Sequence, residues 1–356
     1  MATLVFWLSL GSILYVYFGY PLLLLAWRGL IPRPVKKSPR EPSVSIVIAM
    51  HNESRNVRAK MQNLLTLDYP EDKVQIIVSL DAPTDGTDAL MVEYRSNRVR
   101  VLDSAIRRGK AAALNSALAV CNGEIVVFAD ARQRFEPSAI RELVANFADP
   151  SVGAVSGELF FLDADGKEAT NAVGLYWRYE KAIRSMESDI HSVPGTTGAI
   201  YAIRRELFEP LPVGTVLDDV VIPMRIVLQG RRAILDRTAR AYDRVSDAPE
   251  MEYEKKCRTL MGNYELFFEL PQLLAPWRNP IFVQTVSHKL GRLIIPYCMA
   301  GLLISNVFLI HDLYGAFFGC QIAWYVLAGI GWRLSRDDNK LTERTAIRLD
   351  QIGKNE

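Results

Sequence analysis

The sequence predicts an α/β protein built on a doubly wound, mostly parallel sheet, with membrane-spanning helices near both ends of the chain. In the middle of the 356 residues, short runs rich in valine and isoleucine alternate with polar turns and helix-like stretches, which is the pattern of a parallel α/β sheet. Outside this region lie three long apolar segments without Asp, Glu, Lys or Arg, each long enough to cross a bilayer.

The first apolar segment runs from Leu4 to Trp27 and predicts an N-terminal transmembrane helix. A cleaved signal peptide is the alternative, but no basic residue precedes the segment and no small-residue cleavage pattern follows it. The next residues, 28–42, combine five Lys and Arg with prolines, which exclude regular structure and favour the cytoplasmic side. We therefore expect the N-terminus to lie outside.

The other two apolar segments, Leu293–Ile310 and Leu313–Trp332, predict a transmembrane hairpin with basic flanks. Buried helices of a soluble core are the alternative. Three spans return the large middle region to the cytoplasm, so we expect a multi-pass protein of the cell (inner) membrane that contacts the lipid bilayer. The predicted parts are a transmembrane helix (1–27), a basic linker (28–42), a cytoplasmic catalytic domain (43–269), an interfacial segment rich in aromatic and basic residues (270–292), the hairpin (293–332) and a polar cytoplasmic tail (333–356).

Cysteine spacing and charge argue against three classes of protein. The four cysteines lie far apart without metal-ligand spacing, which indicates neither a zinc site nor a disulfide framework. The net charge is only +2, and no basic stripe is interleaved with aromatic residues. We therefore expect no nucleic-acid partner.

Polar residues follow each of the first four predicted strands of the middle region. Ligands of open α/β sheets bind beyond the carboxyl ends of the strands, so these residues indicate a nucleotide site. For each one alone, a turn or a helix cap is the plainer explanation. The residues are Glu53, Asp81, Asp85, Lys110 and Asp130.

The motifs VSIVIAMHNE, SLDAPTDGT, RRGKAAALNSAL and VVFADA, in this order, resemble the inverting family 2 glycosyltransferases, whose nucleotide-sugar domain has the GT-A fold. The resemblance extends over nearly the whole chain. It implies that Glu53 and Asp81 contact the base and ribose of the donor and that Lys110 lies near its diphosphate. It also implies that Asp130 is the first aspartate of the DxD metal motif and binds a divalent cation, Mg or Mn.

The second position of that metal motif is Arg132, which has no lone pair to give a cation. We expect the site to bind a metal despite this arginine, because magnesium needs only one or two protein carboxylates besides the phosphates of a substrate. Two alternatives remain open. Arg132 forms an ion pair with Glu136, or it replaces the metal by neutralising the diphosphate directly.

Two further motifs of the resemblance concern the acceptor and the chemical step. The segment GTTGAIYAIRREL resembles the acceptor-side loop of the family, where glycine lets the backbone approach a sugar closely, although a tight turn explains each glycine equally well. Its first four residues are Gly195, Thr196, Thr197 and Gly198. Asp218 and Asp219 begin a helix-like segment, where aspartate is also a normal cap. The resemblance implies that Asp219 is the catalytic base, with Asp218 beside it.

The segment EYEKKCRTLMGN lies where processive relatives have a QxxRW motif. Arg258 keeps the arginine of that motif and would assist the departing nucleoside diphosphate, because guanidinium binds phosphate oxygens bidentately. Thr259 replaces the tryptophan, which argues against processive synthesis of a long polymer.

Together these residues predict a metal-dependent, membrane-bound glycosyltransferase of the hexosyltransferase type. By resemblance, it would move a sugar, with inversion, from a UDP-linked nucleotide-sugar donor to a saccharide or lipid-linked acceptor during extracellular or envelope polysaccharide synthesis. Other polysaccharide-synthesis subunits are candidate partners. The alternatives are a polyprenyl-phosphate glycosyltransferase, whose anionic acceptor needs no base, and a non-catalytic partner subunit with a degenerate DxD site.

Overall fold

The structure, a computed structural model, describes residues 1–162, 175–244, 249–311 and 314–333. The chain divides into two compact units. One comprises Tyr20–Ser246 with Glu254–Leu290 and contains the sheet. The other comprises Met1–Gly19, Asp247–Tyr253 and Gly291–Glu356, and the predicted polar tail, from residue 334 on, lies outside the described residues.

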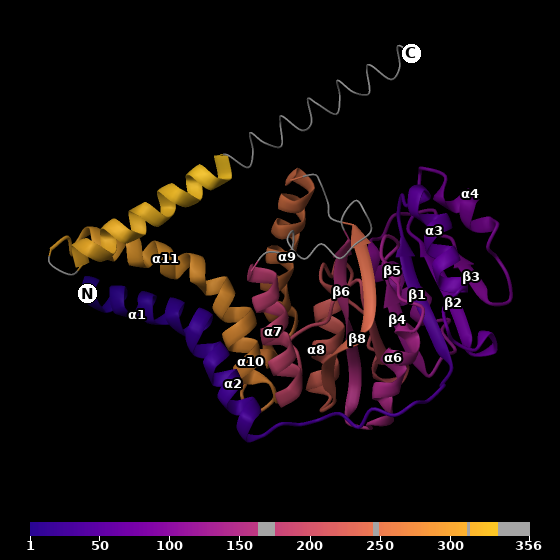
Figure 1. The fold of residues 1–356 in the computed structure, drawn as a ribbon. Helices are drawn as coiled ribbons and strands as arrows, with labels where there is room; N and C mark the ends of the chain where they lie inside the picture. Colours follow the sequence, from indigo (N-terminus) through magenta and orange to yellow (C-terminus); the bar gives the residue numbers. More distant parts are fainter. Residues whose placement is uncertain (163–174, 245–248, 312–313, 334–356) are drawn as a thin grey trace, which may run out of the picture. The chain divides into compact units, whose positions relative to one another are not determined.

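The first unit contains a sheet of eight described strands in the order β3-β2-β1-β4-β7-β6-β8-β5 (Figure 1). β1 to β4 pair in parallel, and so do β6 and β8, whereas β7 runs antiparallel to β4 and β6, and β5 runs antiparallel to β8. The predicted mostly parallel α/β sheet is therefore confirmed. The strands are β1 (Val44–Met50), β2 (Val74–Leu80), β3 (Val99–Leu102), β4 (Ile125–Ala129), β5 (Arg134–Phe135), β6 (Val152–Leu162), β7 (Ile200–Arg204) and β8 (Arg232–Arg244).

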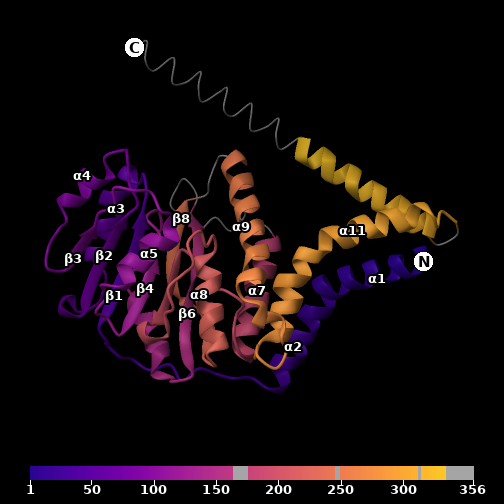
Figure 2. The same cartoon turned by 180° about the vertical axis from the view of Figure 1, so that it is seen from behind.

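Helices cover both faces of this sheet, because successive strand side chains point to opposite sides. In β1, Ile46 and Ile48 join one buried apolar cluster, which includes residues of α3 and α6, while Val47 joins a second, which includes residues of α5 and α8 (Figure 2). The doubly wound pattern predicted from the sequence arises from these two clusters. The helices are α3 (Ser54–Leu65), α4 (Thr87–Val92), α5 (Lys110–Leu118), α6 (Ala139–Ala145), α7 (Leu175–Ile190), α8 (Asp218–Leu228) and α9 (Pro249–Glu269).

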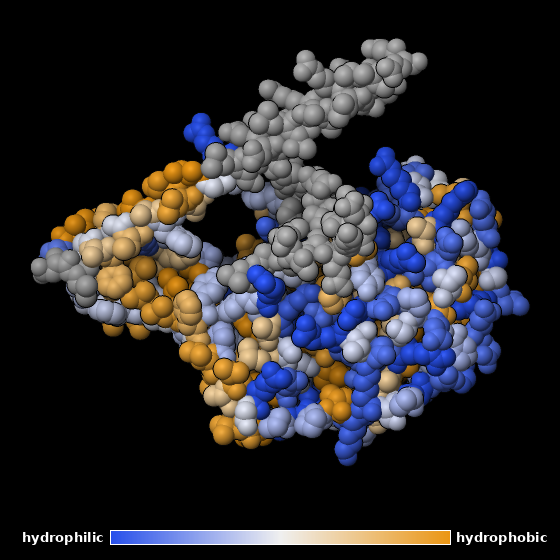
Figure 3. Space-filling model, in the orientation of Figure 1, coloured by the Kyte–Doolittle hydropathy of each residue, from blue (hydrophilic) through white to orange (hydrophobic). Residues whose placement is uncertain are grey.

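Three described helices are long and apolar enough to cross a membrane. They span Ala2–Leu30, Phe282–Val307 and Tyr314–Arg333, and apolar residues dominate their surfaces in Figure 3. The first contains α1 (Ala2–Leu14), η1 (Tyr15–Gly19) and α2 (Tyr20–Leu30); the second contains α10 (Phe282–Gln284), η6 (Thr285–Leu290) and α11 (Gly291–Val307).

The second of these helices begins earlier than the sequence predicts. It starts at Phe282, within the segment 270–292 that is expected to lie at the membrane interface. The reason is packing: the polar side chains of Gln284, Thr285 and Ser287 are buried, so this stretch has partners inside the sheet-containing unit. Only the part of the segment before Phe282 lacks a long helix.

Candidate active site

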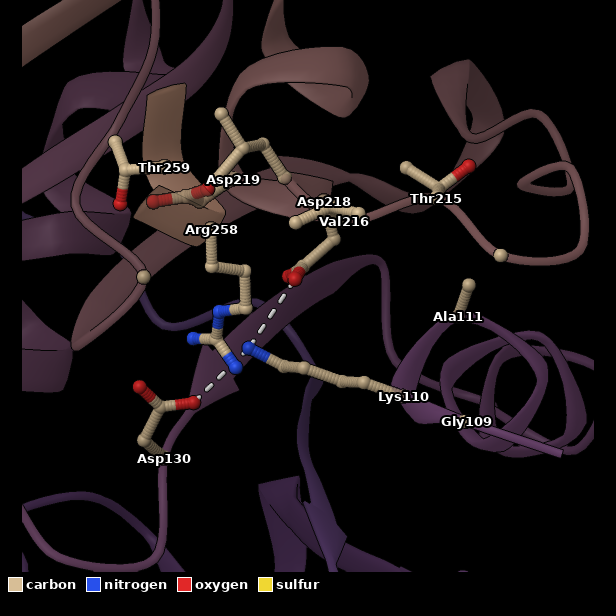
Figure 4. Close-up of a pocket in the computed structure, with 13 residues that line it drawn as sticks. Gly109, Lys110, Ala111, Asp130, Thr215, Val216, Asp218, Asp219, Arg258 and Thr259 are labelled. Atoms are coloured by element: carbon tan, nitrogen blue, oxygen red, sulfur yellow. Dashed lines mark hydrogen bonds and ion pairs between the residues drawn. The ribbon is translucent and has the colours of Figure 1, made fainter. Parts of the chain in front are cut away.

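A pocket of about 330 Å³ in the sheet-containing unit gathers charged residues from four elements (Figure 4). Parallel strands bring their carboxyl ends to one edge of the sheet, and the residues that follow them face a common space. The charged residues that line the pocket are Lys110 at the start of α5, Asp130 after β4, Asp218 and Asp219 at the start of α8, and Arg258 on α9.

Lys110 connects two of the carboxylates in this pocket. Its Nζ lies 3.0 Å from Oδ1 of Asp130 and 3.2 Å from Oδ1 of Asp218. Burial lowers the pKa of the Lys110 amine, but the negative charges of Asp218 and Asp130 raise it by more than burial lowers it. The pKa of Lys110 therefore lies above its usual range. Lys110 is therefore a permanent cation, suited to an anionic ligand such as a diphosphate.

Asp81 holds the loop that leads to Lys110. Its two carboxylate oxygens accept hydrogen bonds from the backbone N–H groups of Arg108 (2.7 Å) and Gly109 (2.9 Å). Gly109 has a φ of +87°, which a side chain would disfavour. In the structure Asp81 thus acts on the protein backbone and does not line the pocket. Its predicted contact with a donor ribose or base stays a prediction.

Asp218 and Asp219 differ in their surroundings. Asp218 is buried, and its oxygens contact Lys110 and the hydroxyl of Tyr201 (3.3 Å). The carboxylate of Asp219 makes no hydrogen bond to a described residue. Burial, and then the like charge of Asp218, raise the pKa of Asp219 to about 6, although Lys110 and Lys289 act against this rise. Asp219 is therefore the more suitable of the two to accept a proton near neutral pH.

The predicted acceptor-side loop packs directly on Asp219. Thr196 donates two hydrogen bonds of 2.8 Å, from its backbone N and its Oγ1, to the backbone carbonyl of Asp219. A Cβ at Gly198 would lie 3.2 Å from Oδ2 of Asp219, so a side chain at this position would crowd the Asp219 carboxylate. Only Gly198 of this loop lines the pocket.

Two partly buried cations, Arg184 and Lys289, lie beside this loop. Arg184 of α7 donates hydrogen bonds to Ser156 Oγ (3.2 Å) and to the carbonyl of Gly195 (3.3 Å), while Ser156 Oγ also accepts one from the backbone of Thr197 (3.1 Å). The Nζ of Lys289 lies 3.6 Å from the place that a Cβ at Gly195 would occupy. The only signal for Arg184 in the sequence is a charge in an amphipathic helix.

Glu53 and Asp85 lie at the ends of the first two strands but not in the pocket. Glu53 precedes α3 and accepts a hydrogen bond from Asn56, and Asp85 accepts hydrogen bonds from Ser54 and Thr87. The contacts of Asp85 with the backbone N–H groups of Ser54 and Thr87 are those of a turn and helix-start residue, whereas, within the described chain, the Glu53 carboxylate makes no capping hydrogen bond. A donor contact of Glu53 stays a prediction.

The residues around Asp130 fit a cation that is shared with a substrate. Within the described residues no three His, Cys, Asp or Glu side chains gather as a metal cage. Asp130 is 36% exposed, and only its Oδ1 is held by Lys110. One free carboxylate oxygen suits magnesium or manganese, which complete their coordination with water and phosphate oxygens.

Among the described residues, Arg132 does not form the expected alternative ion pair with Glu136. Across the part of the chain that the structure describes, Glu136 instead accepts a hydrogen bond from Tyr242 (3.3 Å) and lies 3.9 Å from Arg240. Arg132 is exposed and has no hydrogen-bond partner among these residues. Its guanidinium is therefore available to solvent or to a ligand.

Helix α9 forms part of the pocket lining. A Cβ at Gly262 would lie 2.5 Å from Cγ of Leu217, so glycine allows α9 to approach the loop before α8 closely. This approach places Arg258 and Thr259 on the pocket wall, and the side chain of Arg258 points inward (Figure 4). The structure thus brings together Lys110, Asp130, Asp218, Asp219, Gly198 and Arg258 of the predicted residues.

The mixed α/β sheet, with a pocket of lysine, arginine and carboxylates beside its strand ends, has the architecture of the GT-A class. Residues 45–211 match the family described as Glycosyl transferase family 2. The match covers nearly half of the chain and confirms the resemblance to this family that the sequence motifs show.

Similar proteins agree with this assignment. The chain is 30% identical over 200 residues to the probable glycosyltransferase YdaM of Bacillus subtilis, covering 51% of this chain and 45% of that protein. It is 32% identical over 116 residues to a poly-β-1,6-N-acetyl-D-glucosamine synthase of Staphylococcus epidermidis, covering 32% and 28%. Both matches thus span less than half of the relative.

A solved structure shares the fold over most of its length. It is the mannosyltransferase PcManGT from Pyrobaculum calidifontis in complex with GDP-Man and Mn2+, with a TM-score of 0.67 and 24% identity over 92% of this chain and 96% of that one. At this identity the likeness establishes the fold.

Proposed function

We propose that the chain is a membrane-bound inverting glycosyltransferase that moves a hexose from a nucleotide-sugar donor, UDP-linked as the sequence predicts, to a saccharide or lipid-linked acceptor. The observation that carries the proposal is the pocket itself. It combines Asp219, whose pKa burial and Asp218 raise to about 6, with the cations Lys110 and Arg258. A base and a diphosphate-binding group are the two functions that a single displacement at an anomeric carbon requires.

In the proposed reaction, Asp219 takes the proton of the acceptor hydroxyl as its oxygen forms a bond to the anomeric carbon. The bond from that carbon to the phosphate oxygen breaks at the same time, and the configuration inverts because attack and departure occur on opposite faces. The nucleoside diphosphate leaves with the bonding electron pair. Lys110 and Arg258 stabilise its negative charge, which grows in the transition state.

A divalent cation at Asp130 would add further positive charge to the donor diphosphate. The exposed carboxylate of Asp130 supports this part of the proposal. Lys110 already pairs with Asp130, so the lysine holds the carboxylate at the pocket wall in the free protein. Arg132 is placed two residues further on and is a candidate contact for a phosphate.

The destination of the sugar rests on relatives and on the membrane helices. A match to a poly-β-1,6-N-acetyl-D-glucosamine synthase supports a role in extracellular or envelope polysaccharide synthesis, with other subunits as candidate partners. Transfer to a polyprenyl phosphate remains the second candidate within enzymes. The pKa of Asp219 favours transfer to a hydroxyl acceptor, because a polyprenyl phosphate is already an anion and needs no base near neutral pH.

Hydrolysis of individual nucleotide sugars by the purified chain tests the proposed function without knowledge of the acceptor. We expect slow release of nucleoside diphosphate from one or a few UDP-linked sugars in the presence of Mg2+ or Mn2+. A GDP-linked set serves as the comparison, because the solved structure of the same fold holds GDP-Man. No turnover of any donor or with any saccharide acceptor, with detergent, lipid and metal supplied, would favour the non-catalytic subunit.

The three candidate membrane helices support localisation in a membrane, and we propose the orientation with the N-terminus outside. Single cysteines introduced in a cysteine-free background test it in intact cells. Ala2→Cys should react with an impermeant reagent, whereas Glu206→Cys, at an exposed position in the sheet-containing unit, should react only after permeabilisation. Labelling of Glu206→Cys in intact cells would contradict the proposed orientation and favour the opposite one.

A further inference from the structure

A buried lysine contacts the chain directly after the pocket residue Asp130. Lys60 of α3 is only 2% exposed, and its Nζ donates a hydrogen bond of 2.8 Å to the backbone carbonyl of Gln133. The same Nζ lies 4.3 Å from the ring centre of Phe135, which is within the range of a cation–π contact. We call residues 130–135 the Asp130 segment. Lys60 therefore holds this segment from α3.

Two other side chains hold the same segment. Asn63 exchanges two hydrogen bonds with the backbone of Phe135: its Nδ2 donates to the carbonyl (2.8 Å), and its Oδ1 accepts from the N–H (2.7 Å). The side chain of Gln133 donates a hydrogen bond of 2.7 Å to Asp243 of β8. Lys60 and Asn63 are three residues apart and share one face of α3. The Asp130 segment is therefore fixed from α3 and from β8.

A lysine at this buried position opposes the stability of the fold. An ammonium has three N–H donors, but among the described residues the Lys60 Nζ has one hydrogen-bond acceptor and no ion pair. Burial lowers the pKa of the Lys60 amine to about 7, and the negative charge of Asp130 opposes this fall. An apolar side chain of similar size would fill the same space without a charge. Packing alone thus does not require a lysine here.

We propose that Lys60 is a positioning residue for the donor site. By holding the carbonyl of Gln133, it fixes the connection between β4 and β5, and with it the direction in which Asp130 presents its carboxylate to a divalent cation. Lys110 holds only one oxygen of Asp130, so the backbone behind Asp130 decides where the other oxygen lies. The inference rests on the proposed function, because it takes Asp130 as the ligand of the cation.

Lys60→Met tests the proposal in the full-length chain in detergent. Methionine keeps the unbranched apolar stem and removes the donor and the charge. The probe is the nucleoside diphosphate, UDP or GDP, that the hydrolysis assay selects. We expect the Mn2+ concentration for half-maximal binding of this nucleotide to rise by roughly 10-fold or more, the scale seen when a group that orients a metal ligand is lost. Nucleotide affinity without metal should stay unchanged, because Lys110 and Arg258 remain in the pocket.

Calorimetric titration with and without Mn2+ measures both affinities, so the result does not depend on turnover. The temperature of unfolding then separates a positioning role from a structural one. Replacing a lysine that only supports the fold would lower this temperature. Removing an incompletely paired buried charge should instead leave it unchanged or raise it.

The matched control is Lys73→Met, in the same compact unit, where the lysine is 39% exposed and pairs with Glu41. It should leave the Mn2+ dependence of nucleotide binding unchanged. Unchanged Mn2+ dependence in Lys60→Met would overturn this inference alone. So would an equal loss of both affinities together with a lower temperature of unfolding, which is the result of a structural role. If Mn2+ has no effect on nucleotide binding by the unsubstituted chain, the cation at Asp130 is wrong, and the role of Lys60 with it.

Discussion

Asp130→Ala is expected to abolish sugar transfer and to remove the effect of Mg2+ or Mn2+ on donor binding. Asp130 supplies the carboxylate oxygen at the pocket wall, and Arg132 cannot replace it because guanidinium has only donors. We expect turnover to fall by at least about 100-fold, the scale seen when one group that stabilises transition-state charge is lost. Calorimetric titration of the nucleotide with and without metal measures binding apart from activity.

Two matched variants separate the metal from the other contacts of Asp130. Asp130→Asn keeps the size of the side chain and an oxygen near Lys110 but removes the charge, so it should bind metal weakly and still fold. Arg132→Ala should be milder than either. Full turnover in excess chelator would contradict the metal at Asp130. That result, together with an inactive Arg132→Ala, would show that arginine takes the place of the cation.

Asp219→Asn is expected to lower turnover by roughly 100-fold or more while nucleotide affinity stays unchanged, because a general base acts in the chemical step. Steady-state rates and nucleotide titration measure the two quantities separately. An equal loss of binding and turnover would identify Asp219 as a donor ligand or a structural residue. Nearly intact activity would favour a polyprenyl-phosphate acceptor.

The pH dependence of the unsubstituted enzyme provides an independent check on Asp219. A base works only when it is deprotonated, so activity should rise with pH through about 6, the pKa to which burial and Asp218 raise this carboxyl. Asp219→Asn should lose this rise. Among its charged neighbours, Lys110 and Lys289 lower the pKa of Asp219, and Asp130 raises it. Lys289→Met should therefore move the rise to higher pH, which a merely structural role of Lys289 would not do.

Much of the site could be predicted from the sequence because its residues follow strands that a local pattern reveals. Alternating and continuous apolar runs mark β1 to β4, and parallel pairing of those strands brings Lys110 and Asp130 to one edge. The apolar segments near the two ends are equally local signals, since length and composition alone indicate a span. These features need no knowledge of distant contacts.

Only the tertiary structure decided which of the predicted residues meet. Asp81 has the same sequence signal as Asp130, but its carboxylate holds backbone N–H groups and stays outside the pocket. Arg184 comes from a helix without any site motif, and contacts with the acceptor-side loop reveal its role. A single sequence reports polarity and periodicity, whereas the partner of a charge depends on elements far along the chain.

The same reason explains the ends of the membrane helices and the exposed apolar residues of α9. Gln284 and Thr285 are polar and argue against a membrane helix in the sequence, yet they are buried by packing in the sheet-containing unit, so the helix begins at Phe282. Met261 and Phe268 belong to an ordinary amphipathic pattern, whose apolar side usually faces a core. The sequence by itself determined the sheet, the spans and most charges of the pocket. The tertiary structure decided which faces are covered, because packing against distant elements buries Leu266 of α9 in an apolar cluster with residues of α8, whereas Phe268 of the same helix stays exposed.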